Sequence, residues 1–255
     1  MAITKAQRQE VRSLKRKDER WKTRKIMVEG EKCIEELRGS SWIVERIYFT
    51  SSWSGHSILD AAIESGIEIV DVSQKDMEMM SALKTCPGLL ALAHFPSNDV
   101  KQCAVPALYL DGLTDPGNVG TLVRTADWFG WEGVIVSRNS ADPFGPKALQ
   151  ASMGSAFHIP IHVLDFGELE PEMRRHVVGL DAGGVDMYAT PKSTRPTLLV
   201  VGSESHGLSD EVKTNCDFIA SIPGAGRTES LNAASSGAIA MAHFFQMGGS
   251  VDQRS

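Results

Sequence analysis

Two stretches in the last third of the chain each combine an apolar run with a glycine-containing loop. They are residues 200–207 (VVGSESHG) and residues 222–232 (IPGAGRTESLN), and a helix-like segment follows each of them. Residues 109–120 (YLDGLTDPGNVG) form a third stretch of this kind. Strands that break into loops before helices are typical of open α/β sheets, which bind ligands at the carboxyl ends of their strands. We therefore expect the three loops to form one ligand pocket.

The 255 residues are enough for two domains, and the pattern of apolar runs predicts two. Residues 1–98 alternate short apolar strands with helical patterns and are predicted to form a small α/β/α domain. The polar, breaker-rich residues 96–102 (PSNDVKQ) are the predicted linker. We expect strands at 26–28, 43–49, 67–72 and 89–95, and helices at 31–37, 58–64 and 75–83, the last of them capped by Ser73.

Residues 104–249 form the second predicted domain, in which near-continuous Val, Ile and Leu runs alternate with helices. This pattern is typical of a parallel sheet covered on both faces. The last helix is rich in Ala, Gly and Ser, which suits close packing inside the fold or across a dimer. We expect strands at 107–111, 134–136, 159–163, 177–181, 198–201 and 218–222, and helices at 119–129, 147–153 and 231–246.

Charge is distributed unevenly along the chain. The net charge is −6, yet residues 1–25 hold ten Lys or Arg against three acidic residues, a local charge of +7. A basic N-terminal arm on an acidic body favours contact with phosphate at one surface over general attraction to nucleic acid. The alternative is a solvated amphipathic helix whose charges bind nothing specific.

Composition and motifs exclude several other classes of protein. No window reaches the roughly 18 apolar residues that cross a bilayer, and the N-terminus lacks the apolar core of an export signal, so we expect a cytoplasmic protein. The four cysteines are dispersed, without a C-x-x-C pair or a zinc-like histidine spacing, so we expect free thiols and no metal site. The sequence also lacks the G-x-G-x-x-G of an NAD site and the Gly-Lys-Ser/Thr of a P-loop.

Three motifs in the predicted loops resemble those of the SpoU (TrmH-type) RNA 2'-O-ribose methyltransferases, within the SPOUT superfamily. They are Asn118-x-Gly120-x-x-x-Arg124, then Gly202-x-Glu204-x-x-Gly207, and Ile222-Pro223 followed by Ser230-Leu231-Asn232. Residues 147–161 resemble the segment between the first two motifs of the family. Residues 27–32 (MVEGEK) resemble the beginning of the small ribosomal-protein-like RNA-binding domain that many members carry. The resemblance therefore covers nearly the whole chain.

The resemblance implies a Rossmann-like parallel sheet whose C-terminal part is threaded into a trefoil knot. It also implies a homodimer that acts on RNA and holds S-adenosyl-L-methionine, in a bent shape, between the second and third motif loops. Glycine in these loops lets the backbone approach a ligand and adopt positive φ. The residues that the resemblance assigns to the cofactor are Gly202, Glu204, Gly207, Ile222, Pro223, Leu231 and Asn232.

Methyl transfer to a ribose requires a positioned 2'-hydroxyl and removal of its proton, because a protonated sugar hydroxyl is a poor nucleophile. The resemblance places Arg124 at that hydroxyl, either as the base often described for the family or as a clamp on the adjacent phosphate. The clamp needs no proton loss, and arginine keeps its proton in proteins. Asn118 would orient Arg124 or the substrate, and Glu204 would position the loops. Ser230 and Asn232 would complete the polar wall.

The N-terminal domain resembles that of relatives that modify rRNA. This resemblance favours ribosomal RNA over transfer RNA as the substrate. A tRNA 2'-O-methyltransferase and a noncatalytic RNA-binding protein that keeps the fold remain alternatives. One departure from the family pattern concerns Ala234, which stands where many relatives have serine and is followed by Ser235. His206, inside the second motif, is a candidate for contact at the edge of the substrate.

Overall fold

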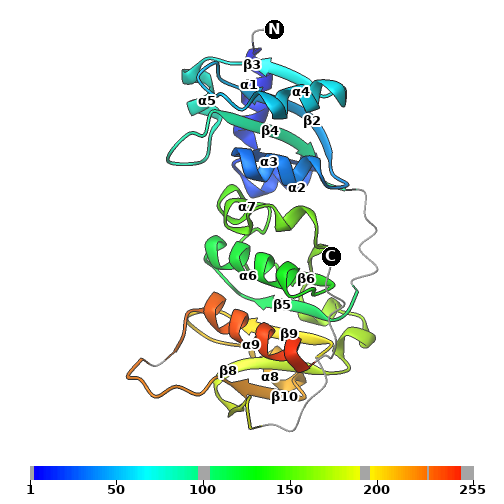
Figure 1. Cartoon of the computed structure of the whole chain (residues 1–255). Coiled ribbons are helices and arrows are strands. Elements are labelled where there is room, and N and C mark those ends of the chain that lie inside the picture. The colour runs from blue at the N-terminus through cyan, green and yellow to red at the C-terminus, as the bar shows by residue number, and fades with distance from the viewer. Residues whose placement is uncertain (1–2, 97–103, 190–195, 229, 248–255) are drawn as a thin grey trace. The chain divides into compact units, whose positions relative to one another are not determined.

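The computed structural model describes residues 3–96, 104–189, 196–228 and 230–247 (Figure 1). Contacts divide the chain into two compact units, one of Met1–Asp99 with Phe144–His158 and the other of Val100–Pro143 with Ile159–Ser255. The segment Phe144–His158 therefore packs with the N-terminal unit, although its place in the sequence predicts that it belongs to the domain of residues 104–249. Residues 97–102 of the predicted linker lie outside the described residues.

The N-terminal unit is built on a four-stranded sheet with the strand order β1-β4-β2-β3. β4 is antiparallel to both β1 and β2, and β3 runs parallel to β2 at the edge. As predicted, Ser73 caps α5, because its side chain accepts a hydrogen bond from the backbone of Asp76. The elements are β1 (Lys25–Glu29), β2 (Ile43–Phe49), β3 (Glu68–Asp71), β4 (Leu89–His94), α1 (Lys5–Ser13), α2 (Lys17–Thr23), α3 (Glu31–Arg38), α4 (His56–Glu64), α5 (Gln74–Met80), α7 (Pro146–Ser152) and the short 3-10 helix η1 (Ser155–Phe157).

The basic N-terminal segment is helical and packs within its own unit, and its contact with phosphate stays a prediction. It folds into α1 and α2, and Val11 and Leu14 lie in the core of the unit. Its cations also bind within the unit. Arg20 is 3% exposed and donates from Nη1 to the Leu14 carbonyl at 2.6 Å, and Lys25 Nζ lies 2.6 Å from Glu10 Oε1. The charge that this segment offers to phosphate is therefore smaller than the sequence implies.

The C-terminal unit contains a six-stranded sheet with the order β10-β8-β9-β5-β6-β7, in which every neighbouring pair is parallel. The prediction of a parallel sheet is confirmed. The apolar runs that predicted the strands form the core, where Tyr109, Ile135 and Val200 are at most 1% exposed. The elements are β5 (Ala107–Asp111), β6 (Gly133–Val136), β7 (Ile161–Val163), β8 (Val177–Asp186), β9 (Leu198–Gly202), β10 (Phe218–Ser221), α6 (Pro116–Trp128), α8 (Asp210–Asn215), α9 (Ala233–Met247) and the 3-10 helices η2 (Phe166–Glu168) and η3 (Pro171–Arg174).

Small residues of α9 allow this helix to pack closely within the C-terminal unit. A β-carbon at Gly237 would lie 2.4 Å from Leu122 Cδ2 of α6 and 3.2 Å from Val201 Cγ2 of β9. Ala240 and Met241 of α9 are fully buried. Internal packing therefore accounts for Gly237, and α9 is held against both α6 and β9.

Two findings bear on the classes that the composition excludes. None of the helices in the described ranges combines the length and apolar character needed to span a membrane. Among the described residues no group of three or more His, Cys, Asp or Glu is arranged to hold a metal ion.

The cysteines that the structure describes are Cys33, Cys86 and Cys216, which are free thiols, and Cys103 lies outside the described residues. Burial raises the pKa of Cys33 and raises the pKa of Cys216 to about 11.

Candidate active site

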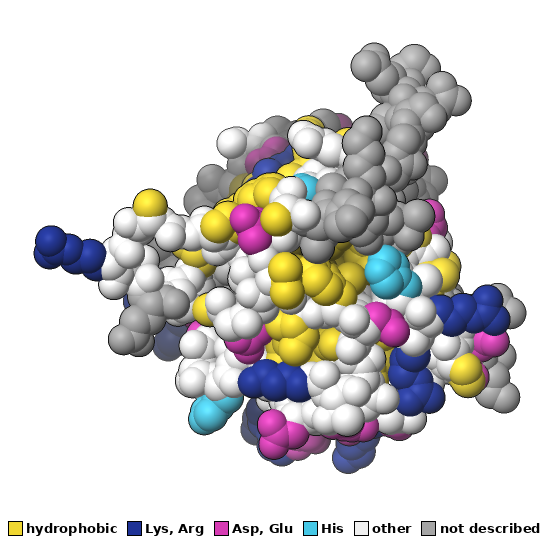
Figure 2. Space-filling view, turned by 90° about the horizontal axis from the view of Figure 1, so that it is seen from below, with side chains coloured by type: hydrophobic (Ala, Val, Ile, Leu, Met, Phe, Trp, Pro, Cys, Tyr) yellow, Lys and Arg dark blue, Asp and Glu magenta, His cyan; other side chains and the backbone are white. Residues whose placement is uncertain are grey.

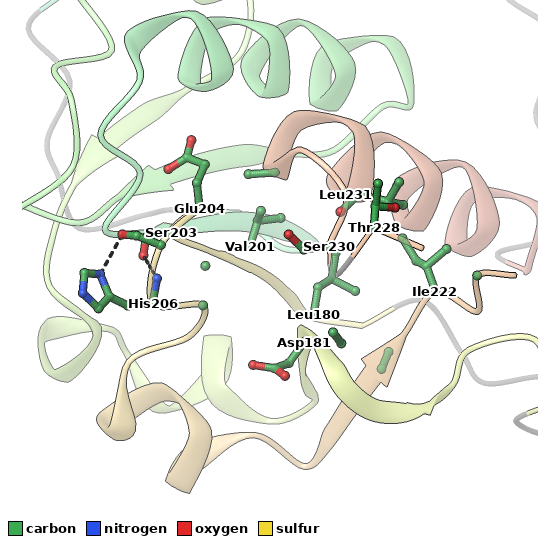
Figure 3. A pocket seen from close by; sticks show the side chains of 18 of the residues that line it. Leu180, Asp181, Val201, Ser203, Glu204, His206, Ile222, Thr228, Ser230 and Leu231 are labelled. Carbon is green, nitrogen blue, oxygen red and sulfur yellow. Dashed lines mark hydrogen bonds between the residues drawn. The ribbon is translucent and has the colours of Figure 1, made fainter. Parts of the chain in front are cut away.

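A cavity of about 560 Å³ lies beside β8 and at the carboxyl ends of β9 and β10. Two of the predicted loops form its walls, with Ser203 and Glu204 on one side and Ile222 and Leu231 on the other (Figure 3). The predicted cofactor-binding residues in its lining are Gly202, Glu204, Gly207, Ile222, Pro223 and Leu231, and Ser230 lines it too. Of the other predicted site residues, Asn118, Arg124 and Asn232 are not among the described residues of the lining.

The loop after β9 folds back on itself, and its glycines make this possible. Ser203 and Gly207 exchange two backbone hydrogen bonds of 2.9 and 3.0 Å. Gly207 has a φ of +67°, a region that favours glycine. A β-carbon at Gly202 would lie 2.3 Å from the carbonyl carbon of Gly207. From the sequence, these glycines are expected to make room for a ligand, but at Gly202 the loop's own backbone already leaves no room for a side chain.

The local sequence places Asn118 in the first turn of α6. Asp115 is the N-cap residue, and its carboxylate accepts a hydrogen bond from the Gly117 N–H at 2.5 Å, while Pro116 occupies the start of the helix. From this position Asn118 Nδ2 donates to Glu204 Oε1 at 2.6 Å. Hydrogen bonds to a charged acceptor are stronger than those between neutral groups. The first and second motifs are thus joined directly by their side chains.

Asn232 joins the third motif to this pair. Its Nδ2 donates to Asn118 Oδ1 at 3.2 Å. Its Oδ1 accepts from the backbone N–H groups of Ala234 and Ser235 at 2.9 and 3.2 Å, so the same side chain caps α9. Ala234 takes part through its backbone alone. A chain of hydrogen bonds therefore runs from the start of α9 through Asn118 to Glu204.

Arg124 does not lie with this group. It is exposed on α6, and within the described chain its guanidinium has no hydrogen bond or ion pair. It lies six positions after Asn118, which is about one and two-thirds turns of helix, so the two side chains leave α6 in different directions. Arg124 shares an exposed stripe with Thr121 and with Trp128, which is 81% exposed. The structure therefore does not place Arg124 beside Asn118 or in the cavity of its own chain.

The charge around the cavity is negative. The carboxylates of Asp181 and Glu204 line it, and none of the described lining residues is Lys or Arg. Lys213 Nζ approaches Asp181 Oδ2 from outside the lining at 3.7 Å. Apolar side chains, among them Val201 and Leu231, supply the rest of the wall. Such a cavity favours a ligand that has an apolar ring and a positive charge over a polyphosphate.

Comparison with known proteins decides the family. Residues 106–242 match the model of the SpoU rRNA Methylase family, and residues 6–91 match the MRM3-like substrate binding domain. The chain belongs to the SpoU rRNA methylase family. The family predicted from the three motifs is thereby confirmed.

Two curated relatives of this SpoU methylase have named activities. The 23S rRNA (guanosine(2553)-2'-O)-methyltransferase RlmP of Bacillus subtilis is 31% identical, over 94% of this chain and 98% of the relative. The 23S rRNA (uridine(2479)-2'-O)-methyltransferase of Streptomyces viridochromogenes is 37% identical, over 62% of this chain and 60% of the relative. The SpoU methylase thus matches the first relative over nearly its full length and spans about 60% of the second.

Solved structures of similar proteins include two with the cofactor. The SpoU methyltransferase AviRb of Streptomyces viridochromogenes, in complex with AdoMet, is 26% identical over 95% of this chain and 98% of that chain, with a TM-score of 0.84. The AdoMet-bound rRNA methyltransferase of Sinorhizobium meliloti is 25% identical over 98% and 99% of the two chains, also with a TM-score of 0.84. The α/β fold class of the SpoU methylases, with a parallel sheet and a small N-terminal domain, is confirmed for this chain.

Several residues that line the cavity of this SpoU methylase were not predicted from the sequence, and two of them carry polar side chains beside Gly207. Ser203 is one, and Asp181 is the other, with its carboxylate 3.1 Å from the position of a β-carbon at Gly207. Asp181 ends a predicted strand, and ligands bind at the carboxyl ends of parallel strands, so the signal was present. His206 also lines the cavity, but its ring points outward in Figure 3, with Nδ1 2.7 Å from Ser205 Oγ.

Proposed function

We propose that this SpoU methylase transfers a methyl group from S-adenosyl-L-methionine to a ribose 2'-hydroxyl of ribosomal RNA. One observation carries the proposal: the chain of hydrogen bonds from Asn232 through Asn118 to Glu204 joins all three motifs, and Glu204 lines the cavity. The Bacillus subtilis and Streptomyces viridochromogenes relatives are both named as 23S rRNA 2'-O-methyltransferases, which supports ribosomal RNA as the substrate class.

The cavity suits S-adenosyl-L-methionine in volume and in chemistry. Its 560 Å³ falls within the range of about 300–1,000 Å³ that is usual for small-molecule sites. The apolar side chains of Val201, Ile222 and Leu231 offer a surface for the adenine ring. The carboxylates of Asp181 and Glu204 match the positive charges of the sulfonium and amino groups. NAD or ATP would instead bring phosphates to these carboxylates.

The side chains have separate tasks in methyl transfer. When bound, the cofactor supplies an electrophilic methyl group on a sulfonium. Asn118 and Asn232 hold the Glu204 loop in one arrangement, so that the polar mouth of the cavity is formed before RNA binds. We assign Arg124 to the phosphate beside the target ribose, where a fixed positive charge stabilises the 2'-oxygen while its proton passes to solvent water. This role agrees with a side chain that keeps its own proton.

We further propose a homodimer in which Arg124 of one subunit serves the cavity of the other. The exposed stripe on α6 that carries Arg124 and Trp128 supports the proposal. Within the described chain, neither side chain packs in the core. Figure 2 shows that the face of the molecule seen from below also carries hydrophobic side chains next to charged ones. A shared site would explain why Arg124 lies outside its own cavity.

Mixed dimers test this arrangement. Arg124→Ala and Asn118→Ala each inactivate one part of the site, so a shared site is intact in one of the two cavities of every mixed dimer. Co-expression of the two variants should then restore about a quarter of the wild-type activity, because half of the dimers are mixed. Light scattering should show a dimer at micromolar concentration. A monomer, or mixtures with no restored activity, would contradict the shared site.

Two further expectations belong to this proposal. We infer a trefoil knot in the C-terminal part of the sheet, which is supported by a strand order that places β9 between β5 and β8 and places β10 beyond β8. We infer the cytoplasm as the compartment, because the relatives that act on 23S rRNA are bacterial proteins.

Mapping of ribose methylation across total RNA, with and without the gene, tests the substrate class. We expect one ribose of ribosomal RNA to lose its methyl group when the gene is absent. Loss at a tRNA nucleotide would favour the tRNA methyltransferase. Unchanged methylation everywhere, together with no cofactor binding by the purified protein, would favour a noncatalytic RNA-binding protein.

A further inference from the structure

The turn after β6 presents an exposed carboxamide two strands away from β9. Its ends are closed by a hydrogen bond from the Ser140 N–H to the Ser137 carbonyl at 3.0 Å, and Arg138 and Asn139 occupy its corners. Asn139 is exposed, and in the described part of the chain its side chain has no hydrogen-bond partner. The fold therefore leaves both the donor and the acceptor of this side chain available.

Buried hydroxyl groups fix this turn against the loop that follows β5. Ser137 Oγ accepts from the Gly112 N–H at 2.9 Å, and Ser140 Oγ accepts from the Leu113 N–H at 3.0 Å. The Ala141 N–H donates to the Leu113 carbonyl at 2.7 Å. Ser137 and Ser140 are only 3% and 6% exposed. The position of Asn139 is thus set by the same loop that leads into α6 and the first motif.

The register of the sheet places Asn139 near the mouth of the cavity. β5 lies between β9 and β6, and Asp111 of β5 is aligned with Gly202 of β9. Gly112 comes next, with a φ of +72°. A β-carbon at Gly112 would lie 3.4 Å from Asn139 Nδ2 and 3.8 Å from Cβ of Ser203, which lines the cavity. The three residues therefore lie in one row, from Asn139 through Gly112 to Ser203. Gly112, at the centre of the row, has no side chain.

The chemistry of this row suits a nucleobase better than a phosphate. Asn139 is neutral and offers two N–H donors and a carbonyl acceptor. Arg138, the nearest cation in the turn, is directed to Glu168, with N–O distances from 2.7 to 3.1 Å, and lies 3.4 Å from Asp165 Oδ2. Proteins read unpaired RNA bases through such donor and acceptor pairs on the base edges.

We propose that Asn139 reads the base of the nucleotide whose ribose is methylated. The inference rests on the proposed function, because it requires a ribose at the cavity mouth beside Glu204. The base of that nucleotide then extends over Gly112, where no side chain occupies the row, and meets the Asn139 carboxamide. Asn139 determines specificity in this account and takes no part in moving the methyl group or the proton.

The test measures base selectivity with defined RNA. The wild-type protein first methylates a 23S rRNA transcript with labelled S-adenosyl-L-methionine, which locates the target nucleotide. Four short RNAs that cover this site, each with a different base at the target, are then compared for wild type, Asn139→Ala and Asn139→Asp. Asn215→Ala is the control, because Asn215 is an exposed carboxamide on α8 that donates to the Glu211 carbonyl. Cofactor affinity and the unfolding midpoint are measured for every variant.

We expect Asn139→Ala to lower kcat/KM for the preferred base by about tenfold or more, the discrimination that one paired base contact provides, and to change the other three RNAs by less than about threefold. Asn139→Asp should lose selectivity too, because it lacks the N–H donors, whereas Asn215→Ala should match wild type. An equal fall on all four RNAs, or unchanged selectivity, would overturn the inference. Failure of the wild-type protein to methylate the transcript would instead count against the proposed function.

Discussion

At the scale of single residues, Asn232 both caps a helix and contacts Asn118, and two substitutions separate these roles. Its Oδ1 caps α9, and its Nδ2 donates to Asn118. Asn232→Asp keeps an acceptor for the cap but places a second oxygen against Asn118 Oδ1. Asn232→Ala removes both contacts. Asp caps helices about as well as Asn, whereas loss of a cap to Ala costs about 1 kcal/mol.

We expect Asn232→Asp to unfold in urea at the wild-type midpoint and to lose about tenfold or more in kcat, in line with the loss of one hydrogen bond. Asn232→Ala should lose stability as well as activity. Urea unfolding and steady-state methylation measure the two effects separately. A fully active Asp variant would show that the link to Asn118 has no role in catalysis.

Arg124 is expected to act on the RNA and not on the cofactor, because it does not line the cavity. Arg124→Ala should abolish methyl transfer while leaving the Kd for S-adenosyl-L-methionine within about threefold of wild type. Arg124→Lys keeps the charge but loses the two-pronged geometry, so we expect partial activity. Isothermal titration and a methylation assay decide the point. Cofactor binding lost together with activity would assign Arg124 to the cavity after all.

At the residue scale, the sequence predicts several residues that line the cavity but not the partners of the side chains around it. Glu204 and Ser230 follow apolar strands, and their place at the carboxyl edge of the sheet could be read from that pattern. The partner of Asn118 could not, because it depends on how the first turn of α6 faces the loop after β9. The Asn118 side chain forms hydrogen bonds with Glu204 and Asn232, and among the described residues it has no hydrogen bond with Arg124.

At the scale of elements, the loop after β9 packs closely on its own backbone, and substitution of Gly202 tests whether this packing matters. An added β-carbon would meet the backbone of Gly207 and Leu208 within 2.3 to 2.5 Å, and a backbone cannot move aside as a flexible side chain does. Gly224, in the loop after β10, lines the same cavity but has nothing within 4 Å of such a carbon, and its φ is not positive. The two positions form a matched pair.

Gly202→Ala should lower the free energy of unfolding by about 1–3 kcal/mol and weaken cofactor binding, because the cavity wall must shift. Gly224→Ala should leave the free energy of unfolding within about 0.5 kcal/mol of wild type. Thermal unfolding and cofactor titration of both variants provide the measurement. Equal behaviour of the two variants would mean that the loop after β9 adapts freely.

Most elements of the fold could be predicted because their signals are local. The strands at 43–49 and 107–111 have the bounds that their apolar runs predict. β8 is longer than predicted and continues to Asp186, because its second half pairs with β10 although its residues are largely exposed. That half lacks the apolar run on which the prediction depended. The strand orders and the cap-to-motif link at Asn232 arise from long-range contacts, which no local pattern specifies.

At the scale of the whole molecule, a cluster of aromatic rings holds the segment 144–158 in the N-terminal unit. Phe144 is 4% exposed, and its ring centroid lies 4.8 Å from that of Phe95, 5.7 Å from that of Trp42 and 5.9 Å from that of Trp21. Phe157 contacts Trp42 at 5.4 Å. The segment 144–158 thus completes the core of the N-terminal unit, although it follows β6 of the other unit in sequence.

Phe144→Ala should therefore destabilise the N-terminal unit by about 3–5 kcal/mol, the usual cost of removing a buried phenylalanine. Phe129→Ala is the matched variant, because Phe129 is a half-buried ring that contacts Phe245 in the C-terminal unit. Unfolding followed by hydrogen exchange reports on each unit separately. If Phe144→Ala weakened only the C-terminal unit, the assignment of residues 144–158 would be wrong.

The most direct test of the central claim uses purified protein, S-adenosyl-L-methionine with a labelled methyl group, and RNA from cells that lack the gene. After complete digestion to nucleosides, we expect the label in a single 2'-O-methylated nucleoside from ribosomal RNA, and none with Asn118→Ala. Label on a base, or no label in RNA from a protein that binds the cofactor, would contradict the account.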